Sequence, residues 1–212
     1  TNRFIYFQNK LWFVINMVKN IDKTIVQPLQ VFMVGTYDEN GVADVMNAAW
    51  AGQCGPKHIT VNFALNRQTL RNIEVNKEFT IAYATKDTLE VADYFGMCSA
   101  SKNPDKVEKS GVSLRKAENV NAPIVEDFPI TLECKVIDMQ EIVPQRCTVT
   151  AEVVNTVVSD DIIDDKGNIN TLDIEFISYD GNKNVYRVLG DAVGKASVGR
   201  SEERRVGKEC RS

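Results

Sequence analysis

Short runs of β-forming residues, separated by turn signals, recur along most of this chain and constrain its fold more than any other feature. Residues 59–64 and 79–84 alternate apolar with polar side chains, which is the two-residue period of a half-buried strand. Asn40 and Gly41 form a hairpin-turn pair after the apolar run at residues 31–36. Further strands are expected at residues 43–51, 130–138, 148–159 and 184–189.

Only short helices interrupt these strands, so the chain lacks a strict alternation of strand and helix. Thr69 is expected to cap a helix at residues 70–75, with Leu70 and Ile73 facing the core. A second short helix is expected at residues 88–95. Many strands with a few short helices predict a mainly β fold, and a closed or nearly closed antiparallel barrel is its natural form.

The length and composition suit one such domain. A chain of 212 residues that is 43% hydrophobic and 25% charged can bury a core without disulfide or metal staples. Lysine and arginine number 25 against 29 aspartate and glutamate, which gives a net charge of -4. The chain as a whole therefore does not attract nucleic acid or an anionic membrane, and we expect neither as a partner.

The cysteines and the single histidine limit the chemistry further. Five cysteines without a C-x-x-C spacing argue against a disulfide framework or a zinc site, and they suit a reducing cytoplasm. His58 is the only histidine, so a Ser-His-Asp triad would depend on it alone. No nucleophile motif accompanies His58, and a place at the mouth of a strand explains it better. Cys98 and Cys134 could form a redox pair, but buried structural thiols are the better explanation.

The two ends of the chain differ from the region between them. Residues 1–16 contain two apolar clusters broken by polar residues, too short for a membrane span of about 20 residues. We expect them to be translated upstream sequence, with Met17 as the start of the domain. Residues 200–212 look like the translation of a sequencing-library adapter. The domain itself is therefore expected at residues 17–199.

One segment has a composition that suits contact with a flat ligand. No G-x-G-x-x-G follows a strand and no P-loop motif occurs, so neither common nucleotide-binding loop is available. A planar ring could instead lie against a strand of small residues that carries one amide and one indole, at Asn47, Ala48, Ala49 and Trp50. An ordinary strand with a half-buried tryptophan would have the same sequence.

Two further segments could bind an anion. Free N–H groups at a helix start, together with Arg67 and Thr69, could hold a phosphate, although a capped surface helix with solvated arginines is the alternative. Ser99, Ser101 and Lys102 supply two hydroxyls and an ammonium directly after a helix. Serine-rich loops of this kind are common, so the last segment is weak evidence by itself.

In their order and spacing, these segments resemble the FMN-binding split-barrel family of flavin reductases and flavoredoxins. The matching stretches are spread over most of the chain, from about residue 28 to residue 194, and lie at residues 28–36, 47–50, 67–73, 93–96, 99–106, 122–123, 132–135 and 186–190. The resemblance implies an antiparallel, Greek-key-like split β-barrel. It also implies a homodimer with FMN held near the subunit interface.

The resemblance assigns a place at the cofactor to each segment. The isoalloxazine ring would lie along Asn47, Ala48, Ala49 and Trp50. The phosphate would be held by Arg67 and Thr69, and a further loop near the cofactor would supply Ser99, Ser101 and Lys102. The family pattern is broken at residues 143–149, where many relatives have a histidine and this chain has Gln145, Arg146 and Cys147.

The flavin itself would carry the redox chemistry, so we expect no dedicated catalytic residue and no metal. NAD(P)H or a reduced protein partner would supply electrons, which reach an acceptor through FMN. The rival explanation is a flavoredoxin-type electron carrier without its own NAD(P)H turnover, or a flavin-binding barrel that is not catalytic. Oxidation of NAD(P)H with free flavin as acceptor would separate these functions.

Overall fold

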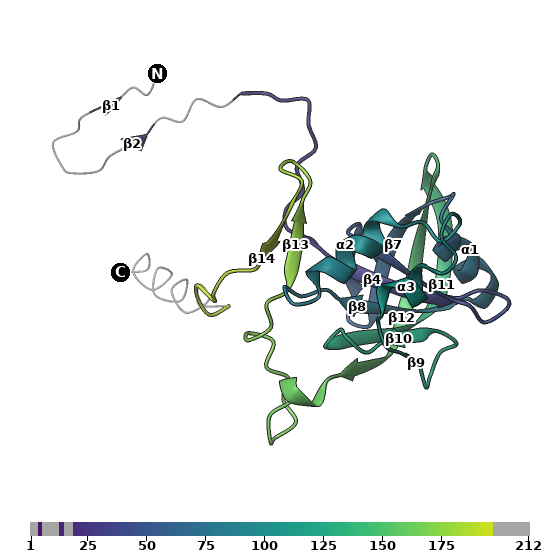
Figure 1. Cartoon of the computed structure of the whole chain (residues 1–212). Coiled ribbons are helices and arrows are strands. Elements are labelled where there is room, and N and C mark those ends of the chain that lie inside the picture. The colour runs from purple at the N-terminus through teal and green to yellow at the C-terminus, as the bar shows by residue number, and fades with distance from the viewer. Residues whose placement is uncertain (1–3, 6–12, 15–18, 197–212) are drawn as a thin grey trace, which may run out of the picture.

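A computed structural model describes residues 4–5, 13–14 and 19–196 (Figure 1). β1 (Phe4–Ile5) and β2 (Phe13–Val14) pair antiparallel. The rest of the expected upstream segment, 1–16, lies outside the described residues, as does the expected adapter-derived tail, 200–212. Within the described part of the chain, no helix is long and apolar enough to cross a membrane.

Seven antiparallel strands form the main sheet, and its two edge strands follow one another in the sequence. Across the sheet the order is β5 (Ala43–Ala48), β4 (Phe32–Tyr37), β8 (Glu78–Tyr83), β11 (Ile130–Val143), β12 (Arg146–Val158), β7 (His58–Ala64) and β6 (Ala51–Gly55). Only Ala49 and Trp50 join β5 to β6, so the sheet curls round until its edges meet. At this corner the backbone N–H of Asn62 donates to the Trp50 carbonyl at 2.9 Å. The expected antiparallel barrel is confirmed.

Strands expected from two-residue alternation lie almost where the pattern predicts them. Residues 59–64 and 79–84 become β7 and β8, and His58 is the first residue of β7, as expected. The single strand expected at residues 43–51 is wrong, because β5 ends at Ala48 and β6 begins only at Ala51. The small residues continue across the break, so their pattern does not mark the corner that closes the barrel.

The hairpin of β11 and β12 is longer than the pattern predicts. It turns at Pro144 and Gln145, and Gln145 has a φ of 63°. Residues 137–143 are mostly exposed, so no buried face imposes an alternation that the sequence could reveal.

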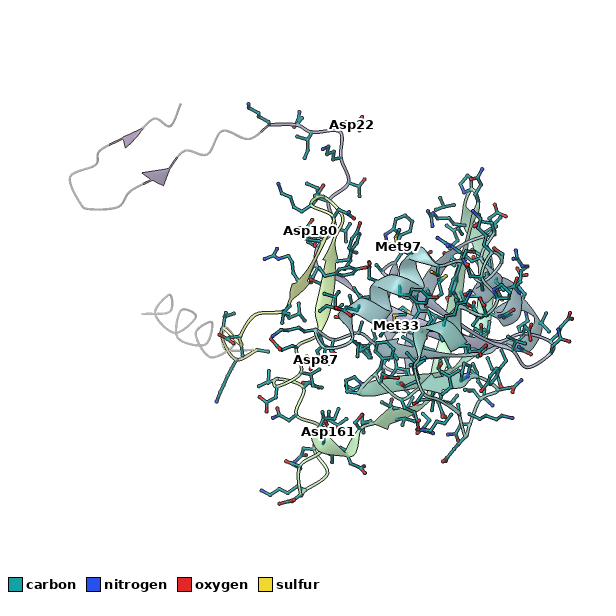
Figure 2. The ribbon with its side chains drawn as sticks, in the orientation of Figure 1. Asp22, Met33, Asp87, Met97, Asp161 and Asp180 are labelled. Atoms are coloured by element: carbon teal, nitrogen blue, oxygen red, sulfur yellow. The ribbon has the colours of Figure 1, made fainter. Side chains whose placement is uncertain are left out.

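Two smaller sheets flank the barrel. One has the order β14 (Val185–Val188), β13 (Ile177–Asp180) and β3 (Leu29–Gln30), and the other pairs β9 (Leu114–Lys116) with β10 (Pro123–Val125). A single turn of 3-10 helix, Asp160–Ile162, follows β12. Figure 2 shows Asp180 at the tip of the β13–β14 hairpin, where β13 ends.

Three short helices connect the strands: α1 (Gln68–Asn76), α2 (Leu89–Met97) and α3 (Lys106–Ser110). The prediction that Thr69 caps α1 is wrong. Arg67 occupies the N-cap position, and the helix start has no side-chain cap. Thr69 lies within the first turn, and its hydroxyl donates to Asp44 of β5 instead. A tertiary partner has therefore taken the hydroxyl that local sequence assigned to the cap. α3 was not predicted.

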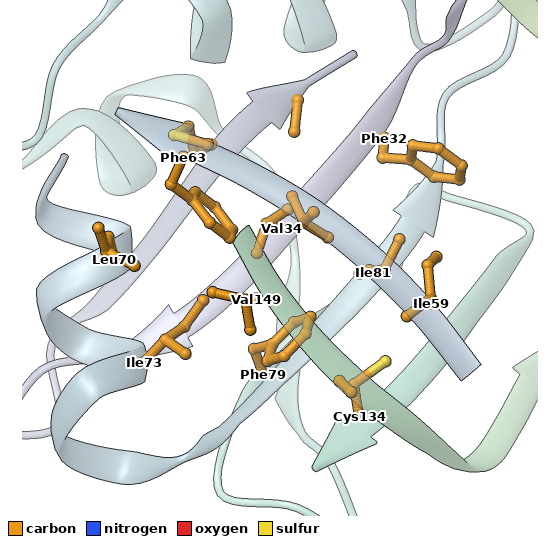
Figure 3. Packing of buried hydrophobic residues seen from close by; sticks show 14 of the residues in the cluster. Phe32, Val34, Ile59, Phe63, Leu70, Ile73, Phe79, Ile81, Cys134 and Val149 are labelled. Atoms are coloured by element: carbon orange, nitrogen blue, oxygen red, sulfur yellow. The ribbon is translucent and has the colours of Figure 1, made fainter. Parts of the chain in front are cut away.

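The barrel interior is apolar and α1 closes one end of it (Figure 3). Leu70 and Ile73 of α1 are buried in the core, as expected. The labelled side chains around them are Phe32, Val34, Ile59, Phe63, Phe79, Ile81, Cys134 and Val149. Each large side chain buried in this way stabilises the fold by about 1.5–3 kcal/mol.

The opposite face of the same strands forms a second core under α2. Met33 and Val45 alternate with the barrel-facing residues of β4 and β5 and pack with Ala92 and Phe95 of α2. Figure 2 shows Met33 inside the packed layer. Both faces of β4 and β5 are thus buried, which holds the corner at Ala49 on a rigid base.

Candidate functional site

A groove of about 220 Å³ opens at the corner where β5 passes into β6. It is lined by five of the nine residues that the sequence predicted for a ligand site, namely Asn47, Ala48, Ala49, Trp50 and Arg67. Asn62 of β7 and Arg146 of β12 also line the groove and contact Trp50. The fold therefore brings together two segments that were singled out separately.

Neighbouring side chains of β5 point to opposite faces of the sheet. Ala48 points into the barrel core, whereas Asn47 points to the opposite face, where its amide donates to the Ala92 carbonyl of α2 at 2.9 Å. A Cβ added at Gly96 of α2 would lie 3.5 Å from the Asn47 side chain. Asn47 is thus packed closely under α2, and its orientation is fixed.

Trp50 has an exposed side chain and a cationic neighbour. Half of its surface, 50%, is accessible to solvent. The guanidinium carbon of Arg146 lies 4.1 Å from the centroid of the Trp50 ring, which is a cation–π contact. Asn62 holds the Trp50 backbone through its own N–H at 2.9 Å and its side-chain amide at 3.3 Å. The indole is therefore presented to the groove on a firmly held backbone.

Arg146 is a groove residue that the sequence did not assign to the site. The sequence marked residues 143–149 only as a departure from the family pattern. In the barrel, Arg146 pairs with Ala64 across β12 and β7, which places it beside the loop that leads to Arg67. Because these two arginines are far apart in the sequence, no local signal could have joined them.

The helix α1 presents unclaimed hydrogen-bond donors at the same place. Its first turn contains no acidic residue, and no side chain caps its N–H groups. Neither Arg67 nor Arg146 forms an ion pair with any residue that the structure describes. Uncapped N–H groups and unpaired guanidiniums form a donor set that suits an anion such as a phosphate.

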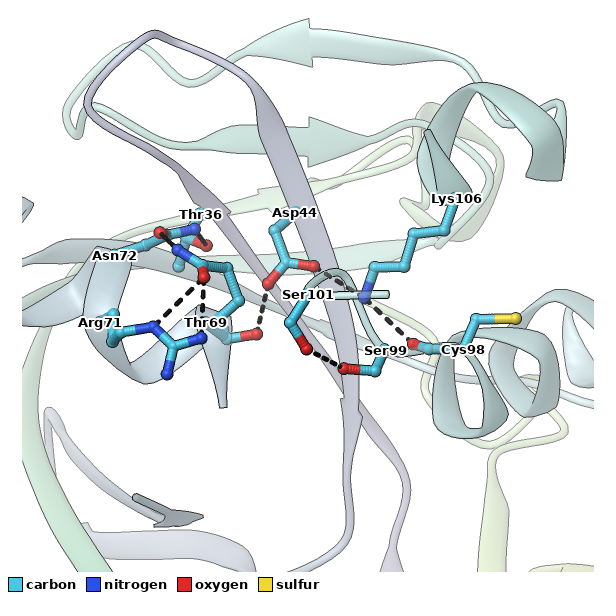
Figure 4. Close-up of polar contacts among 10 residues, drawn as sticks. Thr36, Asp44, Thr69, Arg71, Asn72, Cys98, Ser99, Ser101 and Lys106 are labelled. Carbon is cyan, nitrogen blue, oxygen red and sulfur yellow. Dashed lines mark hydrogen bonds and ion pairs between the residues drawn. The ribbon is translucent and has the colours of Figure 1, made fainter. Parts of the chain in front are cut away.

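Thr69 lies behind this helix start and already has a partner (Figure 4). Its side chain is buried, and its hydroxyl donates to Asp44 Oδ2 at 2.5 Å. Asp44 Oδ1 in turn lies 2.7 Å from the ammonium of Lys106. The hydroxyl proton of Thr69 is therefore committed inside the protein, and its expected role at a phosphate stays a prediction.

The third predicted segment lies outside the groove but next to this buried cluster. Ser99 and Ser101 share a hydrogen bond of 2.8 Å between their hydroxyls, in the segment that joins α2 to α3. Lys106 donates to the Cys98 carbonyl just before them, at 3.4 Å (Figure 4). Lys102 is exposed and, among the described residues, forms no ion pair. The predicted roles of Ser99, Ser101 and Lys102 stay predictions.

Tyr186 stands beside the site and was missed as an individual residue. Its hydroxyl donates to Asp93 of α2 at 2.8 Å. Burial, and then the hydrogen bond and charge of Asp93, raise the pKa of Tyr186 to about 12, while a hydrogen bond to Asn47 lowers it slightly. Tyr186 is thus a neutral phenol that ties β14 to α2 next to Asn47. Residues 186–190 belong to a stretch that resembles the family, but the resemblance assigned no role to the Tyr186 hydroxyl.

The cysteines show no sign of the redox pair. Cys134 lies in the barrel core, where burial raises the pKa of its thiol to about 12. Cys98 follows the last turn of α2, outside that core, and both thiols are free. A thiol with so high a pKa is a poor nucleophile. Cys134 therefore behaves as a buried structural thiol.

A second hollow of about 540 Å³ adjoins the groove. It shares Ala49 and Trp50 with the groove and is otherwise lined mainly by residues before β4 and by the β13–β14 hairpin, including Leu29 and Tyr179. Small-molecule pockets usually enclose about 300–1,000 Å³, so the groove alone is smaller than a typical cofactor pocket. A ligand that fills the site must extend along the Ala49–Trp50 corner or be covered by further protein.

Comparisons with known proteins show the family and the fold of this chain. Residues 27–173 match the family described as Flavin reductase like domain. Flavoredoxin of Desulfovibrio vulgaris (Miyazaki F) is similar at a TM-score of 0.80 and 30% identity, with 86% of this chain and 100% of that chain covered. Comparison with curated protein sequences gave no match.

More distant structures share the fold alone. The 2-nitrobenzoate 2-nitroreductase of Pseudomonas fluorescens has a TM-score of 0.71 and 21% identity, covering 81% of this chain and 85% of its own. A Shewanella frigidimarina protein with a split barrel domain has a TM-score of 0.70 and 20% identity, covering 80% and 85%. The chain belongs to the flavin reductase-like domain family, and its fold is a split barrel.

Proposed function

We propose that this protein binds FMN at the β5–β6 corner and moves electrons or hydride from NAD(P)H, or from a reduced protein partner, to an acceptor. The observation that carries the proposal is the groove itself. It combines a wall of small residues and one indole with two guanidiniums that have no ion-pair partner among the described residues. A planar ring that carries a phosphate matches both features.

The chain's own residues would divide the work of binding. Arg67 and the uncapped N–H groups of α1 would hold the phosphate, with the Ser99–Lys102 segment nearby. The backbone from Asn47 to Trp50 would support the ring, and Tyr186 would keep Asn47 in place. Bound FMN supplies the electron and hydride chemistry, so the protein needs only to fix the ring and control access to it.

A second copy of the chain would complete the site. The groove is open and smaller than a usual cofactor pocket, and Trp50 leaves half of its surface exposed. Apolar Ile142 and Val143 are also exposed, near the tip of the β11–β12 hairpin. A homodimer would cover such surface, and exposed apolar patches commonly mark interfaces. Sedimentation or light scattering of the purified protein tests this part.

A flavoredoxin-type electron carrier is the second candidate function. The solved flavoredoxin, at 30% identity and with its whole length covered, favours it. The similarity to a nitroreductase at 21% identity favours enzymatic turnover less strongly, because it extends only to the fold. Both functions use the same cofactor site, so the geometry of the groove supports them equally.

The first experiment mixes the full chain with FMN, removes unbound flavin and records the visible spectrum. We expect the absorption spectrum of the retained flavin to be shifted from that of free FMN, and its intensity to correspond to about one FMN per chain. Folded protein without bound flavin would refute the cofactor proposal. Oxidation of NADH or NADPH by the loaded protein, with free flavin as acceptor, then separates the reductase from the carrier: turnover supports the first and its absence supports the second.

A further inference from the structure

A buried ion pair lies beside the proposed cofactor site and has no part in the function described so far. Asp44 of β5 and Lys106, the first residue of α3, approach to 2.7 Å between Oδ1 and Nζ. Their side chains are only 5% and 3% exposed. Lys106 also donates to the Cys98 carbonyl at 3.4 Å and lies over the Phe95 ring, 5.9 Å from its centroid.

Stability alone is a weak reason for such a pair. Removing two charges from water costs free energy that their attraction only partly returns, and apolar replacements of buried pairs are often neutral or stabilising. A buried pair can instead fix one arrangement among several, which makes its connections informative.

One end of the pair is connected to the predicted phosphate segment and the other to the further loop that is predicted near the cofactor. Asp44 accepts a hydrogen bond from the Thr69 hydroxyl at 2.5 Å, and Thr69 is the second residue of α1, within the first turn that follows the N-cap residue Arg67. Lys106 holds the carbonyl immediately before Ser99. Figure 4 shows these contacts as one continuous cluster between α1, β5 and the α2–α3 segment.

We propose that Asp44 and Lys106 are positioning residues for the phosphate end of the cofactor site. The pair fastens the start of α1 and residues 98–106 to β5, so that both donor segments face the same ligand group. β5 also carries Asn47, three residues or about 10 Å further along. One strand thereby sets the distance between the ring wall and the phosphate donors.

The pair also has an electrostatic consequence. Without Lys106, the carboxylate of Asp44 would stand uncompensated behind the helix start and would oppose the binding of an anion there. Lys106 cancels that charge without presenting its own ammonium to the groove. Positioning predicts that loss of the whole pair affects the phosphate of the ligand and has little effect on its ring, and charge cancellation predicts the same for loss of Lys106 alone.

The inference rests on the proposed function, and its test therefore compares two flavins. The full chain and the variant Asp44→Asn/Lys106→Met are titrated with FMN and with riboflavin, which lacks the phosphate. The matched control is Glu175→Gln/Lys86→Met, the same kind of change in an exposed ion pair that spans 2.9 Å and lies outside both donor segments. Amide hydrogen exchange is followed in both variants at Arg71, whose N–H donates to the Arg67 carbonyl, and at Lys102 and Asn103, whose N–H groups donate to the Ser99 carbonyl.

We expect the buried double variant to weaken FMN binding by about tenfold or more, with riboflavin changed less than about twofold. The control should change neither. Exchange at both segments should become faster only in the buried variant. Equal weakening of both flavins, or no weakening of either, would overturn the proposal. If the Met variant does not fold, Asp44→Asn/Lys106→Gln, whose amides can hydrogen-bond, replaces it.

Failure of the proposed function is recognised separately. A wild-type chain that binds neither flavin would refute the cofactor site, and hydrogen exchange alone would then decide the anchoring role. Faster exchange at both segments in the buried variant would support it, and unchanged exchange would overturn it.

Discussion

Two pairs of charged side chains in this protein have opposite surroundings. Asp44 and Lys106 are buried, 2.7 Å apart, and surrounded by further hydrogen bonds. Arg67 and Arg146 line an open groove, and neither forms an ion pair with a described residue. The charges of Asp44 and Lys106 neutralise each other inside the fold, whereas the charges of Arg67 and Arg146 remain available to bind an anion.

The difference teaches which charges maintain the structure and which can act on a ligand. A charge taken out of water needs a partner at once, because an unpaired buried charge is very unfavourable. A guanidinium at the surface keeps its hydration and can stay unpaired at little cost until an anion arrives. Breaking the buried pair by a single substitution should therefore act mainly on stability, whereas substitution of a groove arginine should act on binding and leave stability nearly unchanged.

The largest effect is expected from Lys106→Met alone. This change leaves the carboxylate of Asp44 buried and uncompensated, and it should lower the free energy of unfolding by about 3–5 kcal/mol. Urea unfolding followed by circular dichroism measures the loss. Adding Asp44→Asn should recover most of it. A loss below about 1 kcal/mol for Lys106→Met would mean that the buried pair is not needed for the stability of the fold.

Arg67→Ala tests the other side of the comparison. It should weaken FMN binding by about 1.5–3 kcal/mol, because it removes a charge-assisted contact to the phosphate. Riboflavin binding should not change, and the free energy of unfolding should stay within about 0.5 kcal/mol of the wild type. Arg67→Lys, which keeps the charge, serves as the control. Equal losses of binding free energy for FMN and riboflavin would show that Arg67 does not bind the phosphate.

Cys134 extends the comparison to a buried group that stays neutral. Burial raises the pKa of its thiol from 9.0 to about 12, so the unfolded chain loses this proton first as the pH rises. Its stabilising contribution is complete below pH 9 and is lost as the pH approaches 12. Between these values, unfolding free energy should fall by up to about 1.4 kcal/mol per pH unit more steeply in the wild type than in Cys134→Ala. Parallel slopes in the two proteins would contradict this.

The smallest effect concerns the contact between Arg146 and Trp50. A partly exposed cation–π contact contributes about 0.5–1 kcal/mol. A double-mutant cycle of Arg146→Ala and Trp50→Leu, measured by urea unfolding, should show a coupling free energy of that size. A coupling near zero would show that Arg146 stands over the indole without stabilising it.

Local sequence predicted most of the regular fold. Two-residue alternation placed β7 and β8 within a residue of their bounds, and the apolar spacing of α1 identified Leu70 and Ile73 as core residues. It did not predict the break after Ala48 or the far half of β11. In the first case the small residues run through a corner, and in the second no buried face imposes a pattern.

The candidate site was predicted only in pieces. Asn47, Trp50 and Arg67 were singled out because small, aromatic and cationic groups at strand and helix ends suit a flat anionic ligand, and the fold gathers them in one groove. Arg146 was not assigned, since its neighbours in space come from strands far away in the chain. Thr69 was assigned to a cap because the sequence shows the hydroxyl but not its partner.

The sequence by itself determined the antiparallel barrel, because strand period and turn residues are local properties of the chain. The resemblance of its short motifs to a known family then implied which segments could contact a flavin. Only the tertiary structure decided which charges are paired. Asp44 and Lys106 form an ion pair inside the protein, whereas Arg67 and Arg146 line one groove at its surface, and each pair comes from distant segments of the chain. Charged side chains therefore have different roles inside the protein and at its surface, because the free-energy cost of an unpaired charge depends on its access to water.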